Sequence, residues 1–271
     1  MKKIVSGMLL LFAASFTAQA ATTDTISIAS ERLDTPMKVT VITPDAARTA
    51  PQAQFPTVYL LNGYGGDHTS WTSLQPRLGE LADRYGMVMV MPDGRDSWYW
   101  DAPHNPKMQM ETFIVKELVP YIDSHYPTKA DASKRAITGL SMGGHGALRL
   151  AILHDDVFGS AGSTSGGVDI RPFAKRWKMA QILGERDENP QLWDGMTVAT
   201  LVPQMKGKNL NIIFDCGVSD FFAGVNDDFH KALVEAGVPH DYISRPGNHS
   251  QAYWRNAILY QLLYFNEVFT H

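Results

Sequence analysis

The segment Gly139-Leu140-Ser141-Met142-Gly143-Gly144 lies between an apolar run at 136–138 and a helix-forming run at 147–153. The pattern Gly-x-Ser-x-Gly, placed between a strand and a helix, is typical of a sharp turn that exposes the serine hydroxyl. Glycines flank the serine because side chains at those positions would clash within so tight a turn. We therefore predict a strand, a tight turn at Ser141 and a helix, in that order.

Short, mostly apolar runs elsewhere predict further strands that are buried on both faces, as in the centre of a parallel sheet. With the run before Ser141, they lie at 57–61, 87–91, 135–138 and 210–214. Helical stretches at 110–125, which Pro120 is expected to kink, and at 227–236 and 252–269 alternate with them. Period-two runs at 25–29 and 37–42 predict half-exposed antiparallel strands at one sheet edge. This alternation predicts an α/β fold with helices on both sides of a mostly parallel sheet.

The stretch 168–200 does not follow this alternation and carries Trp177, Trp193 and several charges. Open α/β sheets bind ligands at the carboxyl ends of their strands. We therefore predict either a cap-like insertion over those ends or a surface excursion without a function.

The N-terminus predicts a signal peptide over residues 1–20. Lys2 and Lys3 precede a short apolar run at 8–14, and Ala18-Gln19-Ala20 has the small-x-small pattern of a cleavage site. An uncleaved membrane anchor is the alternative, which the shortness of the run disfavours. We expect a single domain over 21–271 in a bacterial protein that is periplasmic or secreted.

Composition argues against several other classes of protein. With 24 Lys and Arg against 28 Asp and Glu, the chain has a formal charge of −4 and no basic cluster typical of nucleic-acid binding. No later segment reaches the ~20 apolar residues of a membrane-spanning helix, so we expect no membrane contact after leader cleavage. Cys216 is the only cysteine and HExxH spacing is absent, which predicts neither a disulfide nor a metal or cofactor site.

A serine hydroxyl needs an adjacent base to become a nucleophile. His249 follows a strand-like run at 242–244 and a Pro-Gly-Asn turn, directly before the last helical stretch, so it lies on a loop after the last strand. The remaining histidines after Ser141 are weaker candidates because they lie on the adjacent helix, beside charged residues or at the terminus: His145, His154, His230, His240 and His271. The sequence therefore nominates His249 as the base.

Two carboxylates follow the strand at 210–214 and are candidates for the acid that orients the histidine. Asp215 abuts the strand, whereas the Gly217-Val218-Ser219 loop would let Asp220 cross to the imidazole. We favour Asp220 and leave Asp215 as the alternative. Asp93 precedes the serine and is interpreted as structural, because in α/β-hydrolases the acid follows the nucleophile.

An oxyanion hole is expected at the backbone N–H groups of Met142 and Tyr64. In this kind of fold one donor is the amide after the nucleophile, and the other comes from the loop after an early strand. That loop reads Asn62-Gly63-Tyr64-Gly65-Gly66.

These motifs resemble the esterase D family of α/β-hydrolases, over about 26–269. The resemblance rests on Leu60-Leu61-Asn62-Gly63, Met91-Pro92-Asp93-Gly94, the segment around Ser141, Asp215-Cys216-Gly217-Val218-Ser219-Asp220 and Gly247-Asn248-His249. It implies a three-layer α/β/α sandwich and the triad Ser141, Asp220 and His249. Many relatives carry His where this chain has Asn62, a difference that leaves the expected oxyanion amide in place.

Relatives in that family include feruloyl and acetyl-xylan esterases, S-formylglutathione hydrolase and mycolyltransferases. With Trp98, Trp100 and Trp177 as candidate substrate-binding aromatics, we predict a serine carboxylesterase acting on acetyl or feruloyl esters of plant cell-wall polysaccharides. The alternatives are a thioesterase like S-formylglutathione hydrolase, an acyltransferase, and a carbohydrate-binding protein on an inactive hydrolase scaffold.

Overall fold

The structure, a computed structural model, describes residues 20–271, so the predicted signal peptide falls outside the described residues except for Ala20. Eight strands form one sheet in the order β1-β2-β4-β3-β5-β6-β7-β8. They are β1 (Thr22–Ile28), β2 (Met37–Thr43), β3 (Thr57–Leu61), β4 (Val88–Pro92), β5 (Arg135–Gly139), β6 (Ser160–Thr164), β7 (Asn211–Gly217) and β8 (Asp241–Arg245).

The sheet is mostly parallel, as predicted. All pairings from β4 through β3 to β8 are parallel, while β2 is antiparallel to both of its neighbours, β1 and β4. Only β1 is the exposed edge strand that the period-two pattern predicted. Most of β2 is buried because its side chains pack into the apolar cores on the two faces of the sheet.

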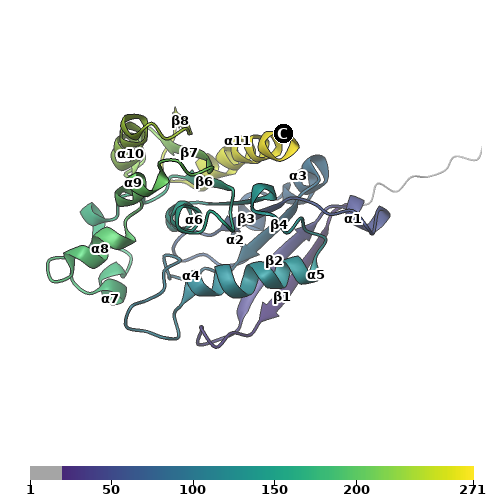
Figure 1. The fold of residues 1–271 in the computed structure, drawn as a ribbon, viewed down its shortest axis with the longest axis horizontal. Helices are drawn as coiled ribbons and strands as arrows, with labels where there is room; N and C mark the ends of the chain where they lie inside the picture. The colour runs from purple at the N-terminus through teal and green to yellow at the C-terminus, as the bar shows by residue number, and fades with distance from the viewer. Residues whose placement is uncertain (1–19) are drawn as a thin grey trace, which may run out of the picture.

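Helices cover both faces of the sheet, which gives three layers. Along β3, Val58 and Leu60 point into one apolar core and Tyr59 and Leu61 into another, as the alternation of side chains along a strand requires. The first core is closed by α2 (Ser70–Leu74), α3 (Leu78–Tyr85) and α11 (Gln251–Thr270). The second is closed by the helical segment 110–125, α6 (Met142–Leu153) and α10 (Ala223–Ala236). Figure 1 shows α3 beside α11, with α4, α5 and α6 across the sheet from them.

Two elements depart from the sequence prediction. Strand β6 was missed because its residues, Ser-Ala-Gly-Ser-Thr, are small and polar, although all five are buried. The predicted helix 110–125 is three helical elements in succession: α4 (Met110–Phe113), the π-helical turn Ile114–Leu118 and α5 (Val119–His125). The wider turn ends two residues before Pro120, which has no N–H to donate within a helix.

The stretch 168–200 folds into short helices that include α7 (Met179–Leu183) and α8 (Pro190–Met196). They lie at the end of the molecule opposite α1 (Ala46–Thr49) (Figure 1). Trp193 of α8 is fully buried in the second core, whereas Trp177, just before α7, is only partly buried. This segment therefore packs on the second core through Trp193, whereas Trp177 lies at the edge of that core and is partly exposed.

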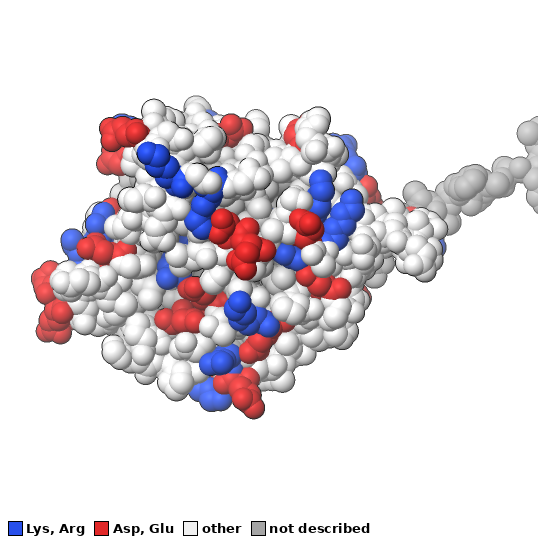
Figure 2. Space-filling model, in the orientation of Figure 1, with Lys and Arg blue, Asp and Glu red and all other residues white. Residues whose placement is uncertain are grey.

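The surface carries both signs of charge. On the face shown in Figure 2, Lys and Arg side chains are interspersed with Asp and Glu. Among residues 20–271, no helix combines the length and the apolar character that crossing a bilayer demands.

Candidate active site

Ser141 occupies the predicted sharp turn between β5 and α6. Its backbone has φ 55° and ψ −115°, a conformation that non-glycine residues rarely adopt and that is typical of strained functional turns. Gly143 permits the turn, since a Cβ there would lie 2.3 Å from the carbonyl oxygen of Leu61. The start of α6 therefore packs directly on the end of β3, and Ser141 lies at the carboxyl edge of the sheet.

His249 links Ser141 to Asp220 through its two ring nitrogens. Nδ1 lies 2.9 Å from Asp220 Oδ2 and Nε2 lies 2.9 Å from Ser141 Oγ. A carboxylate can only accept, so Nδ1–H donates to Asp220 and leaves Nε2 free to accept the serine proton. The Asp220 side chain is fully buried, while the His249 side chain is 16% exposed and lines a cleft. This geometry can move a proton from the hydroxyl to the imidazole.

The alternative acid, Asp215, lies elsewhere. Its carboxylate accepts from the Thr164 hydroxyl and the Gln261 amide, each at 2.8 Å, and Arg245 lies 3.5 Å away. Burial raises the pKa of this carboxyl. The structure thus gives Asp215 partners within the sheet and α11, and only Asp220 contacts His249.

The other candidate histidines after Ser141 make contacts away from its hydroxyl. His145 is buried on α6, where its Nδ1 donates to the carbonyl of Gly167 at 2.9 Å. His154 contacts Glu111, and His230 contacts His240. His271 lies at the C-terminal end of α11 beside Glu267.

The two backbone amides that the sequence nominated as oxyanion donors make no hydrogen bond to another protein group within residues 20–271. The Met142 amide begins α6, next to Ser141. The loop that carries Tyr64 is brought close by Gly63, whose Cβ position would be 3.5 Å from Ser141 Cβ and 2.5 Å from Leu140 Cδ1. Two N–H donors without a protein acceptor, one next to the serine in the chain and one on a loop close to it, can stabilise a negatively charged oxygen.

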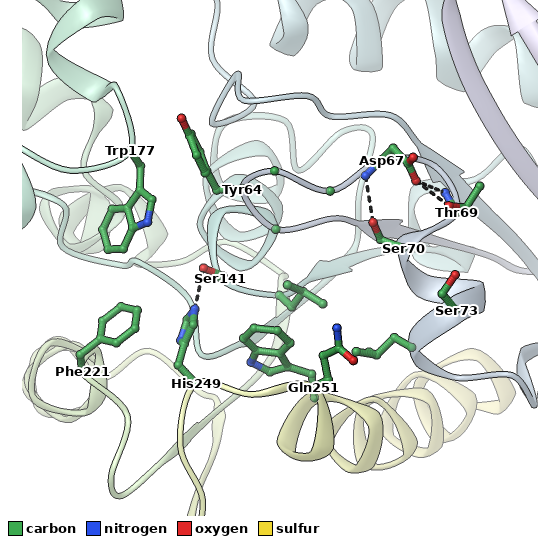
Figure 3. Close-up of a pocket in the computed structure, with 16 residues that line it drawn as sticks. Tyr64, Asp67, Thr69, Ser70, Ser73, Ser141, Trp177, Phe221, His249 and Gln251 are labelled. Carbon is green, nitrogen blue, oxygen red and sulfur yellow. Dashed lines mark hydrogen bonds between the residues drawn. The ribbon is translucent and has the colours of Figure 1, made fainter.

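A cleft of about 640 Å³ opens over Ser141. Figure 3 shows aromatic side chains on one side of the serine and short polar side chains on the other. The aromatic side consists of Tyr64, Trp177 and Phe221. The other side includes the polar residues Asp67, Thr69, Ser70 and Ser73 and extends to Gln251 at the start of α11. Leu74 and Trp254 also line the cleft, and the Trp254 ring lies 4.8 Å from that of His249. The sequence reasoning missed Phe221 and Gln251, although Phe221 directly follows the acid and Gln251 comes two residues after the base.

Of the three tryptophans predicted to bind substrate, only Trp177 lines the cleft. The prediction for Trp98 and Trp100 was wrong, because both are at most 1% exposed and stack on each other beneath the site. Trp100 Nε1 donates to Nε2 of the buried His145 at 2.9 Å. Burial lowers the pKa of His145 to about 3, so this ring is neutral and can accept that bond. The two indoles therefore support α6 from within the core.

No group of three or more His, Cys, Asp or Glu side chains is arranged to hold a metal ion anywhere in 20–271. Cys216 is buried at the end of β7, and burial raises the pKa of its thiol. A thiol in that setting is a poor nucleophile. Among the described residues lining the cleft, Ser141 is therefore the side chain best placed to attack a substrate.

A family model described as "Putative esterase" matches residues 30–265. The chain belongs to this esterase family. The match includes Ser141, Asp220 and His249, so the site lies within the family's shared region. The resemblance inferred from the sequence motifs is confirmed.

Two curated members of the esterase family illustrate its range. Esterase Rv1288 of Mycobacterium tuberculosis is 29% identical over 78% of this chain and 52% of its own length. An acetyl esterase of Caldicellulosiruptor saccharolyticus is 29% identical over 74% of this chain and 80% of its own length. The chain thus spans about half the length of the mycobacterial relative.

Solved structures show that the esterase has the predicted α/β-hydrolase fold. The fluorophosphonate-binding serine hydrolase FphF of Staphylococcus aureus superposes with a TM-score of 0.82 over 92% of this chain and 99% of its own, at 21% identity. A ferulic acid esterase superposes with a TM-score of 0.79 over the same shares, at 26% identity.

Proposed function

We propose that this esterase is a serine carboxylesterase with Ser141 as nucleophile, His249 as general base and Asp220 as the acid that orients it. The observation that carries the proposal is the single imidazole hydrogen-bonded to both the serine hydroxyl and a buried carboxylate, at 2.9 Å each. Membership of the esterase family supports an ester as the substrate.

In the proposed reaction His249 takes the proton of Ser141 as the serine oxygen attacks the ester carbonyl carbon. The carbonyl oxygen becomes negatively charged and accepts hydrogen bonds from the Met142 and Tyr64 amides, each typically worth about 3–4 kcal/mol in the transition state. The imidazolium then gives its proton to the departing alcohol, which leaves an acyl group on Ser141. Water activated by His249 releases the acid and restores the serine.

The division of the cleft supports an ester with two unlike halves. Tyr64, Trp177 and Phe221 offer ring faces, and aromatic pairs stabilise contacts beyond simple area burial. Ser70, Ser73 and Gln251 offer hydroxyl and amide groups across the serine. We propose aromatic acyl esters of hydroxyl-rich alcohols, such as feruloyl esters of polysaccharides, with acetyl esters as smaller substrates. The relatives named acetyl esterase and ferulic acid esterase support this choice.

The proposed location is periplasmic or secreted, on the basis of the leader pattern at 1–20. Polymeric esters outside the cell would be accessible to such an enzyme. Fractionation of cells that express the full chain, with N-terminal sequencing of the product, tests this: a protein retained in the cytosol with Met1 intact would contradict it.

Labelling with a fluorophosphonate tests the nucleophile, and a substrate panel tests the reaction. We expect the wild-type enzyme to be labelled and to hydrolyse nitrophenyl acetate, and Ser141→Ala to lose labelling and about 10⁴-fold or more in kcat while remaining folded. Asn211→Ala, which removes an amide at the far end of β7, is the matched control and should keep both. Near-normal turnover by Ser141→Ala would overturn the proposal, and an unlabelled, inactive wild type would favour a binding protein.

Thioester hydrolysis and acyl transfer use the same groups and remain the alternatives. Comparing kcat/KM for acetyl, butyryl, feruloyl and glutathione thioester substrates distinguishes the first, since a preference for the thioester would reject the carboxylesterase. Product analysis with a competing acceptor alcohol distinguishes the second. Transfer products that dominate at modest acceptor concentrations would indicate an acyltransferase.

A further inference from the structure

The direction of the Tyr64 N–H is fixed by what holds the neighbouring carbonyl. Gly63 and Tyr64 share one peptide group, and the carbonyl oxygen of Gly63 accepts hydrogen bonds from Asn62 Nδ2 and from the Gly66 amide, both at 3.0 Å. This peptide is trans, so its C=O and N–H point in opposite directions. The two bonds to the carbonyl therefore also fix the direction of the Tyr64 N–H, which has no hydrogen-bond acceptor among the described residues.

Asn62 is itself locked in place. The residue is 1% exposed, and its Oδ1 accepts from the Gly94 amide at 2.8 Å and from the Tyr99 hydroxyl at 3.0 Å. Exchanging the oxygen and nitrogen of this side-chain amide would set two donors, Nδ2 and the Gly94 N–H, against each other. The network thus allows one orientation, in which Nδ2 faces Gly63.

A second side chain holds the next peptide of the same loop. The Gly65 amide donates to Asp96 Oδ1 at 3.0 Å. The other oxygen of Asp96 lies 3.7 Å from Lys178 Nζ, which comes from the stretch 168–200. The two peptide groups that flank Tyr64 are therefore each held by a side chain: Asn62 bonds the carbonyl of the first, and Asp96 bonds the amide of the second.

We propose that Asn62 and Asp96 are positioning residues that aim the Tyr64 N–H at the oxyanion. Neither needs to touch the substrate. Without these anchors the Gly63–Tyr64 peptide can rotate and turn its carbonyl oxygen toward the developing negative charge. The oxyanion would then be repelled by the carbonyl oxygen rather than attracted by the N–H. Preorganised donors are effective because they need no such reorganisation during the reaction. This inference rests on the proposed function, because it requires an oxyanion over Ser141.

The test compares Asn62→Ala with Asn211→Ala. Each removes an asparagine amide that donates to a glycine carbonyl, at 3.0 Å in one case and 3.1 Å in the other, but Asn211 lies at the opposite end of its strand from the site. We expect Asn62→Ala to lower kcat by about 10- to 100-fold with KM within about twofold, below the 10²–10³-fold cost of losing a donor outright. Asn211→Ala should change neither.

A trifluoromethyl ketone separates positioning from general destabilisation. Its adduct with the serine places a negatively charged oxygen in the oxyanion hole, so its affinity for Asn62→Ala should fall by the same factor as kcat. A folded Asn62→Ala with kcat and inhibitor affinity within threefold of wild type would overturn the positioning role. So would a loss of kcat with inhibitor affinity unchanged.

Asp96→Ala provides a test that does not disturb a buried residue, because this side chain is 39% exposed. We expect about a 5- to 10-fold loss of kcat, whereas Lys178→Ala, which removes only the outer partner, should stay within about twofold. Unchanged kcat in Asp96→Ala would refute the proposal even if Asn62→Ala did not fold. Ester hydrolysis that persists in Ser141→Ala would instead refute the proposed function itself, so the two failures are distinguishable.

Discussion

The indole of Trp177 stacks on the ring of Phe221, with 5.8 Å between ring centroids and 28° between the ring planes. Phe221 in turn lies against His249, with 4.3 Å between ring centroids. The stretch 168–200 is therefore connected to the general base, His249, through the ring of Phe221. This contact favours the interpretation of the stretch as part of the cleft wall over a surface excursion without a function.

Removing the Trp177 ring should affect aromatic substrates selectively. Aromatic pairs contribute about 0.5–1.5 kcal/mol beyond area burial, so we expect Trp177→Ala to lower kcat/KM for a feruloyl ester by about three- to tenfold. The acetyl ester of the same alcohol is the internal control and should change by less than twofold. Equal losses on both esters would show that Trp177 supports the fold of the cleft rather than binding the acyl group.

Asp215, within β7, and Asp220, in the loop that follows β7, should respond differently to neutralisation. Asp220→Asn removes the charge that stabilises the His249 imidazolium, and we expect kcat to fall by about 10⁴-fold with little change in Tm. Asp215→Asn replaces an acceptor of two buried hydrogen bonds, so we expect a loss of about 1–3 kcal/mol in the free energy of unfolding. Steady-state kinetics and urea unfolding of both variants check this, and a larger kcat loss in Asp215→Asn would reverse the assignment of the acid.

The close approach of α6 to β3 predicts a strong effect of one methyl group. In Gly143→Ala the new Cβ would lie 2.3 Å from the carbonyl oxygen of Leu61 and 2.7 Å from that of Asn62. Backbone atoms must shift, so we expect a loss of at least about 2 kcal/mol in the free energy of unfolding, at the upper end of overpacking costs. Gly195→Ala, in α8 with no atom within 4 Å of the new Cβ, is the control and should be neutral or stabilising by about 0.5–1 kcal/mol. Similar unfolding curves for the two variants would contradict the packing argument.

Buried His145 predicts a loss of stability on acidification. Burial lowers its pKa to about 3 in the folded protein, against about 6.5 in an unfolded chain. Between these values only the unfolded state binds the proton, so the free energy of unfolding falls as pH falls from about 6.5, by up to about 1.4 kcal/mol per pH unit from this residue.

Urea unfolding at pH 7, 6 and 5 measures that slope in the wild type and in His145→Gln. The variant lacks the titrating ring, so its free energy of unfolding should depend less steeply on pH, whatever its absolute stability. All other titrating groups are common to both proteins and cancel in the comparison. Parallel pH dependences would show that His145 is not held neutral in the folded state.

The amino-acid sequence by itself indicated every strand except β6 and nominated Ser141, His249 and Asp220. Local patterns suffice there, because apolar runs mark buried strands and the glycines around Ser141 mark a turn that larger residues cannot adopt. Strand β6 escaped because its small residues carry no apolar signal. It is a strand because it pairs with β5 and β7. At Gly162 close neighbours leave no room for a larger side chain, since a Cβ there would lie 2.6 Å from Thr138 Oγ1 and from Gln261 Oε1.

Only the tertiary structure decided what each of these residues contacts. Asp215 and Asp220 are five positions apart, but Asp215 lies within β7 and contacts α11, whereas the loop after β7 brings Asp220 to His249. Trp98 is buried and Trp177 is at the cleft, although both are tryptophans near the carboxyl edge of the sheet. Such differences depend on which distant segments of the chain pack together. The periodicity of apolar residues within one segment does not indicate which other segment it contacts.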